Sequence, residues 1–139
     1  MNDRFKFRVW LPFEKRMITT DNESFFALNQ HGSLLKINDK NEAFFARIGH
    51  TFSKENIMQC TGLKDKNGKL IYEGDIIRDE HSEAVAIIEW LSYAYSLMAH
   101  VRGMDDYLPL EDICYALEVA TPFEVIGNIY ENKELLNEI

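Results

Sequence analysis

The sequence has few residues that form covalent cross-links and none of the short cysteine motifs that bind zinc. Its 139 residues include only two cysteines, Cys60 and Cys114, and no CxxC pair. Without such a pair, neither a zinc ribbon nor a thioredoxin-like redox site is indicated. Two isolated cysteines are more typical of reduced, buried thiols than of a disulfide, which stays the alternative.

Long apolar runs are also absent. No segment approaches the roughly 20 apolar residues that a membrane-spanning helix requires. The first ten residues, MNDRFKFRVW, alternate charged and aromatic side chains and lack the continuous apolar stretch of a signal peptide. We therefore expect a soluble, cytoplasmic protein with no membrane partner.

Motifs for nucleotides, metals and catalytic nucleophiles are missing as well. The chain contains no GxxxxGKS/T phosphate loop, no GxSxG nucleophile turn and no DxDxDG calcium loop. The histidines are scattered and form no HxH or HxxxH pair; they are His31, His50, His81 and His100. A zinc site assembled from distant residues is the weaker alternative. We therefore expect no cofactor and no metal.

Three pairs of adjacent carboxylates are the remaining catalytic candidates. General acid–base catalysis needs one carboxyl group in a desolvating pocket, so that its pKa rises towards neutrality. The pairs fall in predicted loops with few apolar neighbours, where carboxylates stay solvated. They are Asp79-Glu80, Asp105-Asp106 and Glu111-Asp112. We therefore expect that the protein is not an enzyme.

Charge is distributed unevenly along a chain of ordinary globular composition. Hydrophobic residues make up 46% and charged residues 27%, with a net charge of −8. Residues 1–57 carry nine Lys/Arg and seven Asp/Glu, a net of +2. Residues 58–139 carry six Lys/Arg and sixteen Asp/Glu, a net of −10. Only the N-terminal part is therefore suited to attract nucleic acid.

The N-terminal segment has the strict alternation of a half-buried strand across residues 4–11. One face comprises Phe5, Phe7, Val9 and Leu11, and the other comprises Arg4, Lys6, Arg8 and Trp10. The second face is a candidate binding surface, because cations contact phosphates and an aromatic ring stacks on bases. A solvated outer face is the simpler interpretation of the same alternation.

Short strands are predicted along most of the remaining chain. They cover residues 17–19, 24–28, 34–37, 84–90, 93–101, 116–120 and 123–129, and a short helix follows Asn132. Residues 41–48 fit either a helical turn or a strand. The strand over 84–90 is apolar on both faces, so it should lie inside a sheet or beneath another module or subunit.

The clearest turn signal lies in residues 58–78, MQCTGLKDKNGKLIYEGDIIR. Asn67-Gly68 favours a two-residue type I′ hairpin, in which both central residues take positive φ. The neighbouring charged residues should keep the hairpin tip in water; they are Lys64, Asp65, Lys66 and Lys69. Gly74-Asp75 should break the second strand, and Ile76-Ile77 should restart it.

This stretch resembles the signature of the YopX family, small proteins encoded mainly by bacteriophages and prophages. The matching segment is TGLKDKNGKLIYEGDII, while FKFRVW and EVIGNIYENKELL resemble the start and the end of the family. The fold-defining motif comprises Gly62, Asp65, Asn67, Gly68, Tyr72, Gly74 and Asp75. Cys60 and Lys133 depart from the aromatic residue and the proline that are more usual there. The resemblance implies a YopX-like β-barrel and supplies no catalytic residues.

The predicted fold is mainly β. A β-rich N-terminal module (1–55) would precede a small SH3-like β-barrel domain with a short C-terminal helix (56–139). The sequence predicts an accessory protein of a phage or prophage, located in the cytoplasm of the host bacterium. It would act by protein–protein interaction, as a homo-oligomer that also binds an unidentified host or phage protein. Nucleic-acid binding through Arg4, Lys6, Arg8 and Trp10 is the alternative, and an acidic decoy for a host DNA-binding protein is a weaker hypothesis.

Overall fold

The computed structural model describes residues 6–12, 15–19, 26–28, 34–37, 43–45, 57–105, 107–110 and 123–138. The chain divides into two compact units. Lys6–Met58 forms the N-terminal unit, and Met1–Phe5 together with Gln59–Ile139 forms the C-terminal unit. Among the residues just given, no helix is both long and apolar enough to cross a membrane.

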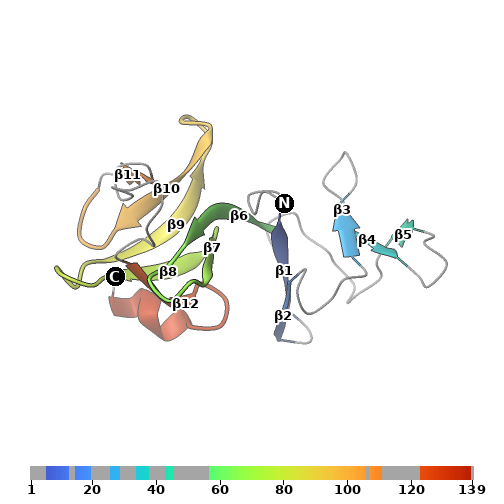
Figure 1. Ribbon diagram of the computed structural model, residues 1–139, viewed down its shortest axis with the longest axis horizontal. Helices are drawn as coiled ribbons and strands as arrows, with labels where there is room; N and C mark the ends of the chain where they lie inside the picture. The colour runs from blue at the N-terminus through green and yellow to red at the C-terminus, as the bar shows by residue number, and fades with distance from the viewer. Residues whose placement is uncertain are drawn as a thin grey trace. The chain divides into compact units, whose positions relative to one another are not determined.

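The described part of the N-terminal unit consists of short antiparallel strands (Figure 1). β1 (Phe7–Leu11) pairs with β2 (Arg16–Thr19). A separate sheet has the order β3-β4-β5, with β3 (Phe26–Leu28), β4 (Leu34–Ile37) and β5 (Ala43–Phe45). The strand predicted over 34–37 is confirmed with the same bounds. Residues 43–45, which the sequence left open, are strand rather than helix.

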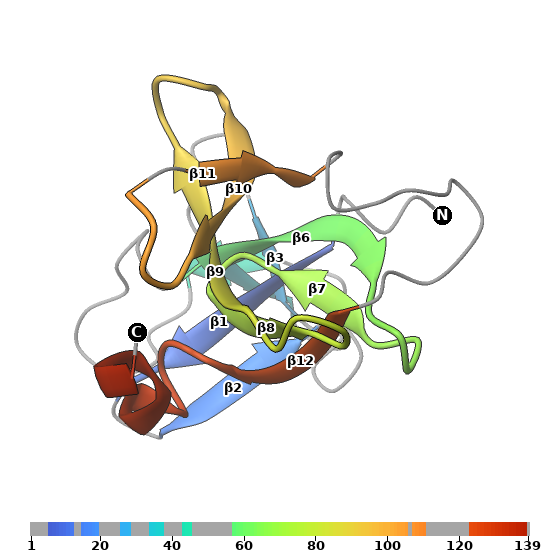
Figure 2. The ribbon, with the colours of Figure 1, turned by 90° about the vertical axis from the view of Figure 1, so that its left-hand side faces the viewer.

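The C-terminal unit is built on a five-stranded antiparallel sheet with the order β11-β10-β9-β8-β12. Its strands are β8 (Asp75–Asp79), β9 (Val85–Leu91), β10 (Ser96–Val101), β11 (Tyr107–Pro109) and β12 (Phe123–Asn128). The sheet is curled, and in Figure 2 the β9–β10 hairpin rises away from β8 and β12. A hairpin of β6 (Ile57–Lys64) and β7 (Leu70–Tyr72) precedes the sheet. The described structure is therefore mainly β, as predicted.

The core of the C-terminal unit is formed by residues on one face of the five-stranded sheet, together with one residue of β7. It comprises Ile71, Ile77, Ala86, Ile88 and Ala99, and Leu63, Leu97, Val101, Leu110, Phe123 and Val125 pack around it. In β9, Ala86 and Ile88 are buried whereas Val85 and Ile87 are half-buried, because successive side chains of a strand point to opposite faces of the sheet. β9 lies between β8 and β10, so the prediction that it is an interior strand is confirmed.

The strand predicted over residues 93–101 begins later than expected. β10 starts at Ser96, opposite Leu91, and residues 92–95 form the turn that connects it to β9. The backbone N–H of Ala94 donates to the carbonyl oxygen of Leu91 at 3.2 Å. The error arose because Tyr93 and Tyr95 have high strand propensity and continue the alternation, although they lie in the turn.

The end of the chain also differs in detail from the prediction. Residues after Asn132 form a 3-10 helix, η3 (Lys133–Glu138), rather than an α-helix. The side chain of Asn132 does not cap this helix: its Oδ1 accepts the N–H of Asn128, at the end of β12. A Cβ on Gly127 would lie 2.6 Å from that Oδ1, so this contact requires glycine there. The strand predicted over 116–120 and the cysteine Cys114 lie outside the described residues.

Candidate functional site

The hairpin of the fold-defining motif has a different turn from the one predicted. Gly68 takes a φ of +82°, but Asn67 is not among the residues with positive φ. The N–H of Gly68 donates to Asp65 O at 3.0 Å, and the N–H of Asp65 donates to Lys69 O at 2.7 Å. This pattern is a type I turn followed by a glycine bulge, the usual three-residue hairpin loop. The prediction of a type I′ turn is therefore wrong.

The cause of the different turn is the carboxylate of Asp65. Its Oδ1 accepts the backbone N–H groups of Asn67 and Lys69, each at 2.9 Å. Such side-chain acceptance two residues onwards favours a type I geometry over the mirror-image turn. The pair Asn-Gly is compatible with both turns, so the deciding residue is the aspartate that precedes it.

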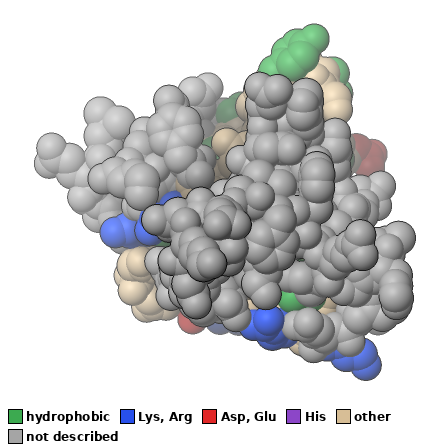
Figure 3. Space-filling model, turned by 90° about the vertical axis from the view of Figure 1, so that its right-hand side faces the viewer, with side chains coloured by type: hydrophobic (Ala, Val, Ile, Leu, Met, Phe, Trp, Pro, Cys, Tyr) green, Lys and Arg blue, Asp and Glu red, His purple; other side chains and the backbone are tan. Residues whose placement is uncertain are grey.

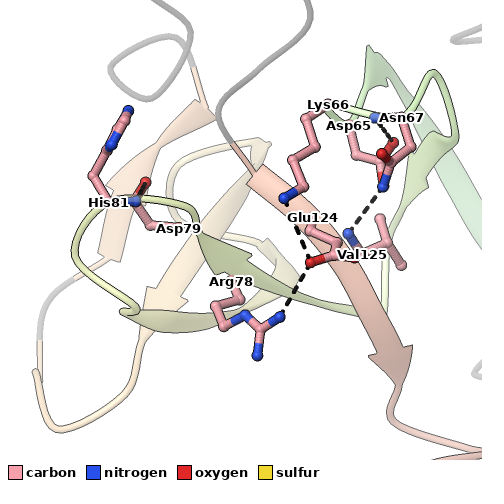
Figure 4. Close-up of polar contacts among 8 residues, drawn as sticks. All are labelled: Asp65, Lys66, Asn67, Arg78, Asp79, His81, Glu124 and Val125. Carbon is pink, nitrogen blue, oxygen red and sulfur yellow. Dashed lines mark hydrogen bonds and ion pairs between the residues drawn. The ribbon is translucent and has the colours of Figure 1, made fainter.

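Asp65 also joins the hairpin to the last strand of the sheet. Its Oδ2 accepts the N–H of Val125 at 3.1 Å (Figure 4). The N–H of Lys66 also donates to Phe123 O at 2.8 Å. Asp65 is only 1% exposed, so the expectation that it lies in water is wrong. The burial is tolerated because three backbone N–H groups bind the carboxylate.

The lysines around the turn do lie at the surface, as predicted. Lys64, Lys66 and Lys69 are exposed, and we call them the lysine tip. The Nζ of Lys66 lies 3.8 Å from Glu124 Oε2, which Arg78 also contacts at 3.1 Å (Figure 4). Because the charge of Asp65 is turned inwards, the outer surface of this hairpin tip is cationic.

The rest of the motif closes the connection between β7 and β8. Gly74 takes a φ of +85°, its N–H donates to Ile88 O and its carbonyl oxygen accepts the N–H of Ile129. The carboxylate of Asp75, which is fully buried, accepts the N–H of Tyr72 at 2.7 Å. Gly62 takes a φ of +83° inside β6, where the pairing with β7 shifts register. The predicted break at Gly74 is confirmed, but β8 restarts at Asp75, one residue earlier than predicted.

The basic strand proposed as a binding surface is only partly accessible. Arg8 is 5% exposed and lies next to the buried Val9, so both faces of β1 are covered there. The expectation that Arg8 lies on a solvated face is therefore wrong. Lys6 and Trp10 are half-buried, and Arg4 lies outside the described residues. Lys15 and Arg16 are exposed at the β1–β2 turn.

Of the three carboxylate pairs, only Asp79-Glu80 lies wholly within the described residues; Asp106, Glu111 and Asp112 lie outside them. Asp79 accepts hydrogen bonds from Ser82 Oγ at 2.6 Å and from the N–H groups of His81 and Ser82. These bonds stabilise the turn between β8 and β9. The bond from Ser82 Oγ is the main reason why the pKa of Asp79 is lowered, whereas a general acid needs a raised pKa. Within the described ranges, no three His, Cys, Asp or Glu side chains are grouped closely enough to hold a metal ion.

Among the described residues of the C-terminal unit, the most exposed aromatic side chains were not predicted from the sequence to be surface residues. Trp90 is 47% exposed, Tyr93 77% and Tyr95 83%, and we call these three residues the aromatic tip. They lie at the end of β9 and in the β9–β10 turn. Green hydrophobic side chains project at the upper edge of Figure 3, at the height of that turn in Figures 1 and 2. The available signal was Ser92 before Tyr93 and Ala94 between the two tyrosines, because serine favours turns and alanine is depleted in strands.

Three titratable side chains lie beside this tip on the outer face of β9, β10 and β11. His100 is opposite Ile87 on one side and Tyr107 on the other, so its ring shares a face with Tyr107 and Glu89. The rings of His100 and Tyr107 lie 4.6 Å apart, and His100 Nδ1 lies 3.7 Å from Glu89 Oε2. A hydrogen bond to Glu89 and the charge of that carboxylate raise the pKa of Tyr107. The three side chains of this group are half-buried at the surface of the sheet.

Comparison with known families identifies the chain. The model of the YopX protein family matches residues 6–137, nearly the whole sequence. The chain belongs to the YopX family. A crystal structure of protein EF1440 from Enterococcus faecalis is similar to this YopX-family chain, with 28% sequence identity and a TM-score of 0.53. The similarity covers 94% of this chain and 96% of the other. No curated protein gives a significant match.

The role of Asp65 in this YopX-family chain can be tested by substitution. Asp65→Ala removes the acceptor of three backbone N–H groups, and each bond to a charged group contributes about 1.5–3 kcal/mol. We expect the free energy of unfolding of the C-terminal unit to fall by about 3–5 kcal/mol in urea titrations followed by tryptophan fluorescence.

Two further variants give the prediction its specificity. Asp65→Asn keeps an oxygen for the turn but places an amide group opposite the N–H of Val125. Its free energy of unfolding should therefore lie between those of the unsubstituted protein and Asp65→Ala. Asn67→Ala, at an exposed position of the same turn, should change the free energy by no more than about 0.5 kcal/mol. Equal stabilities for Asp65→Ala and Asn67→Ala would contradict the assigned role.

Proposed function

We propose that this protein acts by binding other protein chains, and that it self-associates through the aromatic tip. The observation that carries the proposal is the exposure of Trp90, Tyr93 and Tyr95 at one end of one hairpin. Aromatic side chains are enriched at protein interfaces because they bury a large area and lose little conformational entropy. Three of them projecting together are unusual on a surface that stays in water.

The backbone of the turn supports the same proposal. Tyr95 takes a φ of +50°, a conformation that glycine or asparagine adopts far more readily. Such a residue costs about 1 kcal/mol or more, and strained positions of this kind cluster at functional sites. A tyrosine held there with 83% of its surface exposed gives no packing benefit inside the chain. Its benefit would come from a contact with another chain.

The finer parts of the proposal rest on family membership and on the shape of the sheet. As a YopX-family protein, the chain would be an accessory protein of a phage or prophage and would work in the cytoplasm of a host bacterium. The curled sheet of the C-terminal unit would be the wall of a small SH3-like barrel.

Self-association can be measured by light scattering at about 100 μM protein, a concentration at which weak interfaces with micromolar Kd are populated. We expect a mass that is a multiple of the 16.2 kDa chain. The double variant Trp90→Ser/Tyr93→Ser should scatter as a monomer, because the apolar contact area is lost. A monomeric unsubstituted protein at this concentration would contradict the proposal.

Two controls separate association from folding. Met104→Ser removes another exposed hydrophobic side chain, 47% exposed, on the β10–β11 turn at the other end of β10, and should leave the mass unchanged. Tyr95→Gly relieves the strained φ, so it should weaken association without lowering the free energy of unfolding. A loss of both association and stability in Tyr95→Gly would point to a structural role for the tyrosine.

Nucleic-acid binding through the N-terminal strand is the second candidate function, and the exposed Lys15 and Arg16 next to that strand favour it. The net charge of −8 and the burial of Arg8 act against it. We expect no change in the fluorescence anisotropy of labelled single- or double-stranded DNA at ~50 mM salt, where phosphate contacts are strongest. Binding that weakens with added salt and is lost in Lys15→Glu/Arg16→Glu would favour the alternative instead.

A further inference from the structure

Two hairpin tips of the C-terminal unit have complementary chemistry. The lysine tip, on the β6–β7 hairpin, presents Lys64, Lys66 and Lys69. The aromatic tip, on the β9–β10 hairpin, presents Trp90, Tyr93 and Tyr95. We propose that the self-association described above joins the lysine tip of one copy to the aromatic tip of another; this inference rests on the proposed function.

The charges along the chain make the aromatic tip a site for cations. Between Arg78 and Arg102 the sequence contains no Lys or Arg, and its charged residues there are four carboxylates. One of them, Glu89, lies in β9 directly before Trp90, and because successive side chains of a strand alternate, it is on the opposite face of the sheet from Trp90. Faces of Trp and Tyr rings attract ammonium groups through their quadrupole, and no cationic side chain of this stretch competes for the aromatic tip.

The lysine tip is the matching partner within the same chain. Residues 58–139 contain only six Lys/Arg, and three of them lie in the six residues 64–69 that form this tip. The only carboxylate among those six residues, Asp65, is 1% exposed and is bound by backbone N–H groups. Lys66 lies 3.8 Å from Glu124 Oε2, and Lys64 and Lys69 add two further exposed positive charges to the tip of a unit that is otherwise strongly acidic.

The turn geometry fixes both tips for such a contact. The lysine tip is anchored through Asp65 and through the bond from the N–H of Lys66 to Phe123 O. The aromatic tip is fixed by the β9–β10 pairing up to Leu91 and Ser96. Figure 2 shows the two hairpins pointing in different directions, so one copy presents both halves of the contact to neighbours. The contact joins two different patches and is therefore heterologous.

Complementation between two defective variants tests the proposal. The first variant, Trp90→Ser/Tyr93→Ser, keeps the lysine tip; the second, Lys64→Gln/Lys66→Gln/Lys69→Gln, keeps the aromatic tip. Each variant alone should scatter light as a 16.2 kDa monomer at about 100 μM. An equimolar mixture should give particles of two chains, because one intact contact forms between the unlike variants.

The outcomes separate this inference from the proposed function. If the lysine variant associates as the unsubstituted protein does, self-association stands and the lysine–aromatic contact is overturned. If both variants are monomeric and the mixture is monomeric as well, the contact is also overturned. If the unsubstituted protein is monomeric, the proposed self-association itself fails. Circular dichroism of each variant, expected to match the unsubstituted protein, verifies that the substitutions preserve the fold.

Discussion

The buried carboxylate of Asp65 is the interaction on which the C-terminal unit depends. It determines the type of the β6–β7 turn through the N–H groups of Asn67 and Lys69, and it binds the N–H of Val125, which is 60 residues away in sequence. A carboxylate loses its hydration on burial, so only full hydrogen bonding makes 1% exposure tolerable. One side chain thus specifies a local turn and a long-range strand contact together.

This arrangement separates the part of the chain that identifies the family from the part that could bind a partner. In the family motif, Gly62, Gly68 and Gly74 take positive φ, and Asp65 and Asp75 are buried acceptors of backbone N–H groups. These residues are needed to form the turns and are mostly inaccessible to a ligand. The side chains that reach solvent come from positions between them, such as Lys66 and Lys69, and from the β9–β10 turn.

Much of the secondary structure was predictable from local pattern, whereas the turn types and the candidate site were not. Alternation and glycine placement predicted β4, the interior position of β9 and the break at Gly74. The burial of Asp65 could not be predicted, because its third partner, Val125, is distant in sequence. The aromatic tip was missed because strand propensity and alternation cannot show where pairing stops, and pairing stops at Leu91 and Ser96.

The central claim is that the Asp65 carboxylate holds the hairpin onto β12, and hydrogen exchange of single backbone amides tests it most directly. The N–H groups of Asn67, Lys69 and Val125 should exchange slowly and at similar rates, because one cooperative opening exposes all three. The N–H of Asn67 is informative above all, since it lies in an exposed turn where an amide without a carboxylate partner exchanges fast. Fast exchange at Asn67 with slow exchange at Val125 would contradict the account.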